Sequence, residues 1–306
     1  MQLVEQNEAE ELRNLSRYCF LEGGKMIRPT VVLLMAGCCS SFSRHEIPIS
    51  VSQNKVAVVS EMIHTASLVH DDVIDESNER RNRPTVSSMA GNKSAILVGD
   101  YILAKATQLL TTIGDADVIA LLAQVIEDLV KGEFMQLGSR ASEDERFMHY
   151  MMKTFKKTAS LFAHSCKAVA KLAGCDEYSA NMAYEFGKNL GIAFQLIDDT
   201  LDFVVRSSEV GKPTFVDLKL GIATAPILFA SRQHSQLNDL ILRRFSKNGD
   251  VDLAYNLILE SDGLLRSRQL AEQYCKNAVD NLAQFPNSEF KTALVAITSA
   301  QCSRSR

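Results

Sequence analysis

Two short segments of the chain carry three aspartates each in the same spacing: residues 71–75 read DDVID and residues 198–202 read DDTLD. On a helix, residues i and i+4 lie one turn apart on one face, so the first and last aspartate of each segment project in parallel. Like charges this close repel, and burial raises the cost, so a cation should compensate them. Mg²⁺ suits this role because it prefers oxygen ligands and is usually shared between a few carboxylates and substrate phosphates. The candidate metal ligands are Asp71, Asp72, Asp75, Asp198, Asp199 and Asp202.

An acidic segment of this kind can also lie on a solvated surface or at the end of a helix without any function, because aspartate is common at helix ends. The segment HTASLVH precedes the first aspartates and GIAFQLI precedes the second, so both sets follow a strongly apolar stretch. Acidic side chains on facing helices are a known way to build a metal site in a bundle core. Two copies in this context favour the metal site over the surface interpretation.

Basic side chains that could hold phosphates occur near these motifs. The segment GGKMIRP places Lys25 and Arg28 three residues apart at a predicted helix start, where backbone N–H groups and the helix dipole also favour an anion. Arg80 and Arg81 follow the first aspartates within one or two turns. Any single Lys or Arg is more often a solvated surface charge, and His64, two turns before Asp71, is more often a satisfied core residue on spacing alone. Further ammonium groups are Lys156, Lys157, Lys212 and Lys219.

Helices must position these side chains, because apolar residues return at helical spacing through most of the chain. Only 6 prolines and 15 glycines interrupt the 306 residues, and no convincing alternating strand is visible. The sequence therefore predicts a single all-α domain over residues 1–306. The predicted helices include 56–73, 92–110, 118–137, 159–173, 179–205 and 262–282.

Composition excludes several classes of function. The net charge is −4 and no basic stripe is interleaved with aromatics, which argues against a nucleic acid partner. The longest apolar runs are too short for a transmembrane segment, and the acidic N-terminus is neither a signal peptide nor an Arg-rich transit peptide. The 7 cysteines form no CxxC pair, so we expect buried free thiols in a reducing compartment.

At these residues the chain resembles the trans-type polyprenyl diphosphate synthases. GGKMIRP resembles the family's GGK-x-x-RP, HDDVIDESNERR its first aspartate-rich motif and FQLIDDTLDF its second. VGDYIL, GEFMQL, KTFKKTASLF and GKPTFVDLKLGIATAPILFA also fit, so the resemblance spans about residues 20 to 285. It implies an isoprenoid synthase-type helical bundle with a central active-site cavity, which joins isopentenyl diphosphate to an allylic diphosphate with Mg²⁺.

The resemblance also implies a role for each matching residue. Asp71, Asp75 and Asp198 would be the main Mg²⁺ ligands, with the other three aspartates in close or water-mediated support. Thr158 and Gln195 would line the reacting end. The diphosphate of isopentenyl diphosphate would be held by Lys25, Arg28, His64 and Arg81, and that of the allylic substrate by Arg80, Lys157, Lys212 and Lys219.

The chain departs from the family pattern in a few places. Asn82 replaces the usual glycine after the arginine pair, and asparagine tolerates left-handed backbone angles better than most residues. Met26 replaces a more usual basic residue. The chain begins close to its first motif, so we expect a shortened N-terminal helix within residues 1–20.

Product length is predicted from side-chain size. Ala66 and Ser67 lie one turn before Asp71 and are both small, whereas bulky aromatics at these positions stop elongation in short-chain relatives. We therefore expect a long-chain product, as in the family members that make the ubiquinone side chain in mitochondria. The alternatives are a C15 or C20 synthase, a non-catalytic partner subunit, or a terpene cyclase. The resemblance further implies a homodimer or a heterotetramer with a second synthase subunit.

Overall fold

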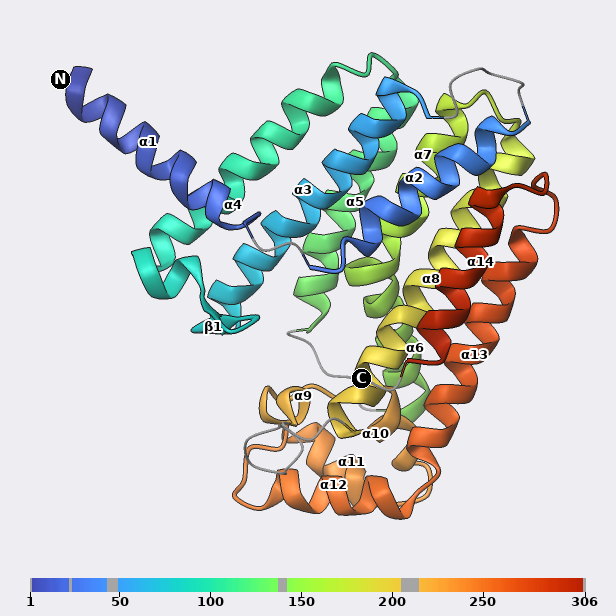
Figure 1. Ribbon diagram of the computed structural model, residues 1–306. Coiled ribbons are helices and arrows are strands. Elements are labelled where there is room, and N and C mark those ends of the chain that lie inside the picture. Colours follow the sequence, from blue (N-terminus) through green and yellow to red (C-terminus); the bar gives the residue numbers. More distant parts are fainter. Residues whose placement is uncertain (1, 22–23, 43–48, 137–141, 205–214, 305–306) are drawn as a thin grey trace.

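Long helices that pack side by side make most of the molecule, and a group of shorter helices closes one end (Figure 1). The structure is a computed structural model that describes residues 2–21, 24–42, 49–136, 142–204 and 215–304. The all-α prediction is confirmed, and each predicted helix matches an observed one. The long helices are α2 (Ile27–Ser40), α3 (Val51–Ile74), α4 (Val86–Thr111), α5 (Ala116–Gln136), α7 (Ser160–Leu172), α8 (Glu177–Val204), α13 (Gly263–Asn281) and α14 (Glu289–Cys302).

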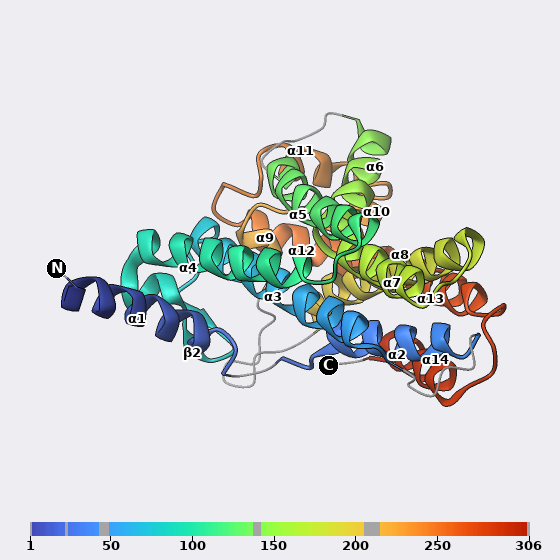
Figure 2. The same ribbon diagram turned by 90° about the horizontal axis from the view of Figure 1, so that it is seen from above.

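The N-terminal helix and several shorter elements complete the bundle. Helix α1 (Gln2–Tyr18) packs on α4 and projects from one side, while α2 and α14 lie side by side (Figure 2). The remaining elements are β1 (Glu79–Arg80), β2 (Arg83–Pro84), α6 (Glu143–Thr154), the π-helix η1 (Phe155–Ala159), α9 (Val216–Lys219), α10 (Ala225–Ala230), α11 (Gln236–Leu242) and α12 (Asp250–Glu260).

Helix α8 is the central support, because its apolar residues contribute to both large core clusters. One cluster fills the space among α2, α3, α5, α7 and α8, and the other lies among α6 and α8 to α13. A smaller cluster joins α3 to α4. That the whole chain is one domain stays a prediction.

Two glycines let α8 approach its neighbour closely. A Cβ atom on Gly187 would lie 2.5 Å from the Phe162 carbonyl oxygen, and one on Gly191 would lie 2.5 Å from the Ala159 Cα. Any larger residue would therefore push the helices apart. The close packing holds α8 against η1 and α7, so that Gln195 reaches Thr158.

A two-residue hairpin follows α3, although the sequence showed no alternating strand. Its strands are only two residues long, which is too short to produce a visible alternation. The turn residues Arg81 and Asn82 have φ angles of 54° and 61°. The expectation that Asn82 adopts left-handed angles in place of glycine is therefore confirmed. The hairpin turns Arg80 and Arg81 back toward α3.

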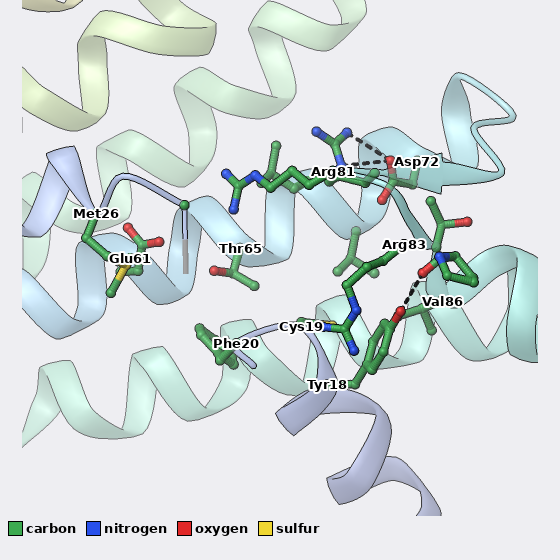
Figure 3. A pocket seen from close by; sticks show the side chains of 16 residues that line it. Tyr18, Cys19, Phe20, Met26, Glu61, Thr65, Asp72, Arg81, Arg83 and Val86 are labelled. Atoms are coloured by element: carbon green, nitrogen blue, oxygen red, sulfur yellow. Dashed lines mark hydrogen bonds and ion pairs between the residues drawn. The ribbon is translucent and has the colours of Figure 1, made fainter. Parts of the chain in front are cut away.

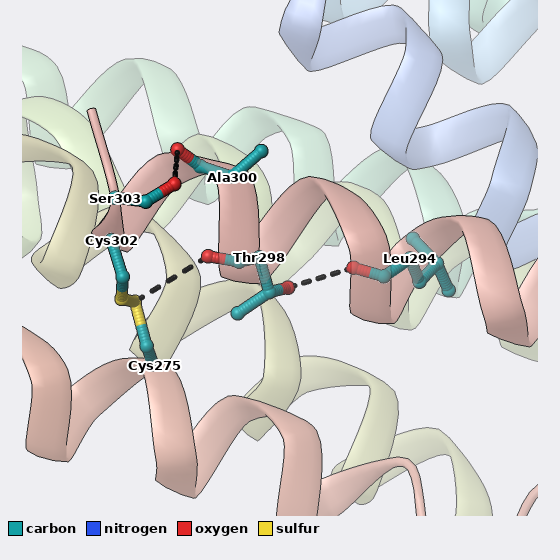
Figure 4. The surroundings of a disulfide bond; sticks show 6 residues. All are labelled: Cys275, Leu294, Thr298, Ala300, Cys302 and Ser303. Carbon is teal, nitrogen blue, oxygen red and sulfur yellow. Dashed lines mark hydrogen bonds between the residues drawn. A yellow bond between two sulfur atoms is a disulfide. The ribbon is translucent and has the colours of Figure 1, made fainter.

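The prediction that all cysteines are free thiols is wrong for one pair. Cys275 on α13 and Cys302 on α14 form a disulfide, with Cα atoms 6.8 Å apart (Figure 4). The two residues are 27 positions apart in the sequence, and only the packing of α14 on α13 brings them together. The other five cysteines are free. Among the described residues, no helix has the length and apolarity needed to cross a bilayer.

Candidate active site

The first aspartate motif lies at the C-terminal end of α3. Asp71 is in the last turn and Asp75 caps the helix, with its N–H donating to the Asp71 carbonyl at 2.8 Å. Within the described chain, neither carboxylate has a hydrogen-bond or ion-pair partner. Burial raises the pKa of Asp71 to about 7, although the charge of Lys157 opposes this, and burial also raises the pKa of Asp75. The nearby positive charge therefore does not offset the cost of burying these two carboxylates.

Asp72 has a different environment from its neighbours. It is only 5% exposed, and Arg80 binds one of its oxygens through Nε at 2.9 Å and Nη2 at 2.8 Å (Figure 3). This pair ties the hairpin to α3. Asp72 therefore fits the supporting role that the sequence analysis gave it.

The second motif lies near the C-terminal end of α8. Asp198 accepts a hydrogen bond from Nη1 of Arg304 at 2.8 Å, and burial still raises its pKa. Asp199 is buried and accepts from Tyr150 Oη at 2.5 Å and from Gln195 Nε2 at 2.7 Å. Burial raises the pKa of Asp199 to about 6, despite these donors.

Asp202 points to the start of α9. Its two oxygens accept from the backbone N–H groups of Val216 and Asp217 at 3.3 Å each. This aspartate therefore serves the N-terminus of a short helix, which a repeat of the DDxxD spacing could not predict. Asp217 itself is a missed candidate, since burial and the nearby Asp199 and Asp202 raise its pKa to about 7.

The described carboxylates are not arranged as a complete set of ligands around one metal ion. In the part of the chain that the structure describes, no three His, Cys, Asp or Glu side chains are close enough to hold one ion. Mutual repulsion keeps unpaired carboxylates apart. The donor set still fits Mg²⁺, because this ion keeps several waters and takes few carboxylates besides substrate phosphates. Asp71, Asp75 and Asp198 are the side chains that could hold it.

A cavity of about 510 Å³ contains all four residues predicted for isopentenyl diphosphate. Arg28 comes from the first turn of α2 and His64 from α3. The Arg81 guanidinium packs closely on Gly24, where a Cβ atom would lie 2.5 Å from its Nη2. The cavity is lined by Gly24, Lys25, Met26, Ile27, Arg28, Glu61, His64, Arg81, Phe194, Gln301 and Arg304.

Arg28 and His64 are joined inside this cavity. Arg28 Nη1 lies 3.0 Å from His64 Nε2. Burial, together with the charge of Arg28, lowers the pKa of His64 to about 2, so the ring is neutral and accepts this bond. Burial also lowers the pKa of Arg28 to about 10, and its buried Nε has no hydrogen-bond partner in the described structure. Glu61 and Asp198 partly compensate this charge, and the buried Nε remains a donor that an anion in the cavity can satisfy.

The π-helix η1 separates two neighbouring lysines. Lys156 pairs with the buried Asp128 at 2.8 Å, whereas Lys157 pairs with Glu133 and bonds Gln136 at 3.2 Å. π-Bulges often occur at functional sites because they re-aim side chains. Lys157 is therefore the lysine of this pair whose charge acts on Asp71 and Asp75.

Lys212 and Lys219 are the two remaining lysines that were predicted to hold the allylic diphosphate. The exposed Lys219 side chain makes no hydrogen bond or ion pair with any described residue. Lys212 lies outside the described residues. Thr158 and Gln195, both predicted to line the reacting end, lie together, since the Thr158 hydroxyl donates to Gln195 Oε1 at 2.8 Å.

The two chain-length residues differ in their surroundings. Ala66 is 0% exposed and packs in the cluster between α3 and α4. Ser67 is part-buried and donates to the His64 carbonyl at 2.9 Å. A second cavity of about 160 Å³ beside α3 is lined by Thr65, Leu68 and Val69, but by neither of these residues (Figure 3). The role of Ala66 and Ser67 stays a prediction.

Sequence reasoning missed several site residues because they come from parts of the chain without a motif. Arg304 is the third residue from the end, and Tyr150 lies seven residues before Lys157. Phe194 lies one turn before Asp198 and Glu61 lies three residues before His64, so helical spacing from these predicted residues was the signal that could have found both.

Comparisons with known proteins identify the family of the chain. The sequence model of the polyprenyl synthetase family matches residues 9–258. The chain is 50% identical over 296 residues to mouse all trans-polyprenyl-diphosphate synthase PDSS1, covering 97% of this chain and 72% of that protein. It is 46% identical over 251 residues to a probable hexaprenyl pyrophosphate synthase, mitochondrial, of Neurospora crassa, covering 80% of this chain and 56% of that protein.

A solved structure extends the comparison to three dimensions. The polyprenyl synthase from Caulobacter crescentus CB15, complexed with calcium and isoprenyl diphosphate, superposes with a TM-score of 0.80 at 30% identity. The match covers 100% of this chain and 97% of that chain. Together with the family match, these likenesses show that the chain belongs to the polyprenyl synthetase family.

Proposed function

We propose that this chain is a Mg²⁺-dependent all-trans polyprenyl diphosphate synthase that extends an allylic diphosphate with isopentenyl diphosphate. One observation carries the proposal: a cationic cavity with an unpartnered buried arginine nitrogen also contains Arg304, which binds Asp198 of the second aspartate motif, and His64, which lies on the helix that carries the first. The cavity would bind the diphosphate of isopentenyl diphosphate, and the aspartates with Arg80 and Lys157 would bind that of the allylic substrate. Two diphosphate sites in one core are what a condensation of two diphosphates requires.

The chemistry follows from these two sites. Mg²⁺ bound by Asp71, Asp75 and Asp198 would neutralise the leaving diphosphate. Arg80 and Lys157 add fixed positive charge there, so the allylic C–O bond breaks with its electron pair on the diphosphate. Arg28 and His64 hold isopentenyl diphosphate so that its double bond forms the new C–C bond to the allylic cation. The proton then lost goes to the released diphosphate. Buried helices exclude water, which would quench the cation.

The competing functions predict different assays. A terpene cyclase uses one diphosphate and gives product without isopentenyl diphosphate, and a non-catalytic subunit gives none with either substrate. A synthase needs both substrates. Product analysis with and without isopentenyl diphosphate therefore separates the three, and allylic product formed without it would overturn the proposal.

The cavity assignment has its own test. Arg28→Ala should raise the apparent KM for isopentenyl diphosphate at least tenfold, the scale of losing a charged hydrogen bond. The KM for the allylic substrate should change far less. Arg266→Ala is a matched control, because Arg266 stacks on Phe229 in another part of the molecule. An equal effect of Arg28→Ala on both substrates would mean that the cavity is assigned to the wrong diphosphate.

We propose a long-chain product for the ubiquinone side chain. This rests on the small residues Ala66 and Ser67 and on relatives whose names indicate polyprenyl and hexaprenyl products. Replacing both residues by phenylalanine places a ring of about 150–250 Å² at each position and should shorten the product to about fifteen or twenty carbons. An unchanged chain that makes only a fifteen-carbon product with its proper partner present would contradict this.

Assembly and location are also proposals. We propose a homodimer or a heterotetramer with a second synthase subunit, and a mitochondrial location. Exposed apolar side chains on α4 and α5, among them Ile96, Leu97, Val130 and Phe134, support a subunit contact. Light scattering that finds a fully active monomer would contradict the assembly.

A further inference from the structure

We propose that Tyr150 is a positioning residue that fixes the orientation of the second aspartate motif; this rests on the proposed function. Tyr150 lies on α6, outside both aspartate segments and outside every basic segment. Its hydroxyl donates to Asp199 Oδ2 at 2.5 Å, and both residues are only 3% exposed. A buried carboxylate without such donors would carry a large desolvation cost, so this contact is held in place.

The second oxygen of Asp199 is also occupied by the protein. Gln195 Nε2 donates to Oδ1 at 2.7 Å, and Gln195 Oε1 in turn accepts from the Thr158 hydroxyl at 2.8 Å. Tyr150, Thr158 and Asp199 lie on α6, η1 and α8, so this chain of hydrogen bonds ties three elements together. Asp199 is thereby withheld from direct metal binding and acts as the anchor of the network.

Asp198 is the neighbour of this anchor on α8. Successive residues of a helix are rotated by about 100°, so a fixed Asp199 leaves Asp198 on the adjoining face. Asp198 keeps 35% of its side chain exposed, next to the cavity cation Arg304. If Tyr150 released Asp199, its carboxylate could turn toward solvent, and the second motif would lose its single orientation. Tyr150 thus acts on the metal site through Asp199 without touching substrate.

The alternative is that the Tyr150 ring only fills space. The ring does pack beside Phe147, with centroids 6.2 Å apart, in the cluster around α10. Tyr150→Phe separates the two roles because it keeps the ring and removes only the hydroxyl. Tyr184→Phe is the matched control, because it also removes only a tyrosine hydroxyl. Tyr184 lies on α8 before the second aspartate motif, and its ring packs against the His164 ring.

The test measures metal binding directly. Mg²⁺ is titrated by calorimetry into the full chain with dimethylallyl thiolodiphosphate, an allylic analogue that ionises poorly. Tyr150→Phe should weaken Mg²⁺ binding about tenfold, the scale of one hydrogen bond to a charged group, and leave the KM for isopentenyl diphosphate within twofold. Tyr184→Phe should bind like the unchanged chain. Equal Mg²⁺ binding by Tyr150→Phe and the unchanged chain would overturn the proposal.

A second variant covers the case in which Tyr150→Phe folds poorly. Asp199→Asn should weaken Mg²⁺ binding by about the same factor, and the double variant should be no worse than either single one, because both changes break the same network. Asp199→Asn binding as poorly as Asp198→Asn would make Asp199 a direct ligand and overturn the proposal. Failure of the proposed function would appear in the unchanged chain as absence of prenyl product, whereas failure of this inference appears only in the variants.

Discussion

The two aspartate motifs have the same spacing and different surroundings. In each motif the second aspartate is buried and hydrogen-bonded, while the first is only part-buried. Asp72 is held by the Arg80 guanidinium, whereas Asp199 is held by the neutral donors Tyr150 and Gln195. Burial raises the pKa of Asp199, and the hydrogen bonds from Tyr150 and Gln195 offset only part of this effect. The same sequence pattern is therefore stabilised electrostatically on α3 and by a hydrogen-bond network on α8.

The outer positions of the motifs differ as well. Asp75 ends α3 with its carboxylate unpaired in the described structure, but Asp202 accepts backbone N–H groups of α9. One turn before the first aspartate, α3 has Ser67 and α8 has Phe194. The small Ser67 donates to the His64 carbonyl, while the Phe194 ring lies with its centroid 5.8 Å from the Arg28 guanidinium. The position one turn before the first aspartate therefore has a small polar side chain on α3 and an aromatic ring on α8.

The largest effect should come from the first aspartate of either motif. Asp71→Ala or Asp198→Ala should lower turnover at least about a hundredfold, the scale of removing one charge-stabilising element, while circular dichroism still reports a helical protein. Asp117→Ala, which removes an exposed partner of Lys171, is the control and should keep full turnover. Near-normal turnover in either site variant would contradict the metal assignment.

The last aspartate of each motif should have a different function. Asp75→Ala should lower turnover at least about tenfold, as expected for a lost charged contact. Asp202→Ala should affect turnover less and should instead lower the free energy of unfolding by about 0.5–2 kcal/mol, as the loss of a helix N-terminal acceptor does. Steady-state rates and urea unfolding of both variants measure this. Equal losses of turnover would mean that the motifs are functionally symmetric.

The cationic anchor of the first motif has a measurable effect on stability. Arg80→Ala leaves the buried Asp72 without its partner and should lower the free energy of unfolding by about 1–3 kcal/mol. It should also raise the KM for the allylic substrate. The double variant Arg80→Ala with Asp72→Asn should recover part of the stability, because the unpaired charge is gone. No recovery in urea unfolding would contradict the anchoring role.

The smallest effect is on pH dependence. Burial raises the pKa of Asp71 to about 7, so the folded protein binds this proton more tightly than the unfolded chain, whose aspartates titrate near about 3.9. Its contribution to stability is full below about pH 4 and is lost as the pH rises through about 7. Urea unfolding with a chelator should therefore show the unchanged chain losing stability from pH 5 to pH 8 relative to Asp71→Asn. Parallel curves would contradict the raised pKa.

Several features followed from the sequence because they depend on local periodicity. The long helices were predictable from apolar spacing, and Lys25, Arg28, His64 and Arg81 were assigned to one substrate by motif resemblance; all four line one cavity. The left-handed angles at Asn82 also follow from residue type. The helices and the Asn82 turn depend on residues within a few turns of one another, so a short segment contains the information, whereas the four cavity residues were found because each belongs to a short motif.

Other features were decided only by the tertiary structure. The roles of Asp199 and Asp202 depend on partners 49 and 14 residues away, and Asp198 meets Arg304 at a separation of 106 residues. The disulfide between Cys275 and Cys302 likewise needs two helices to pack together. Identical DDxxD segments became different because a carboxylate's state is set by burial and by the donors that the fold brings to it. Those donors come from distant helices, and no local pattern specifies them.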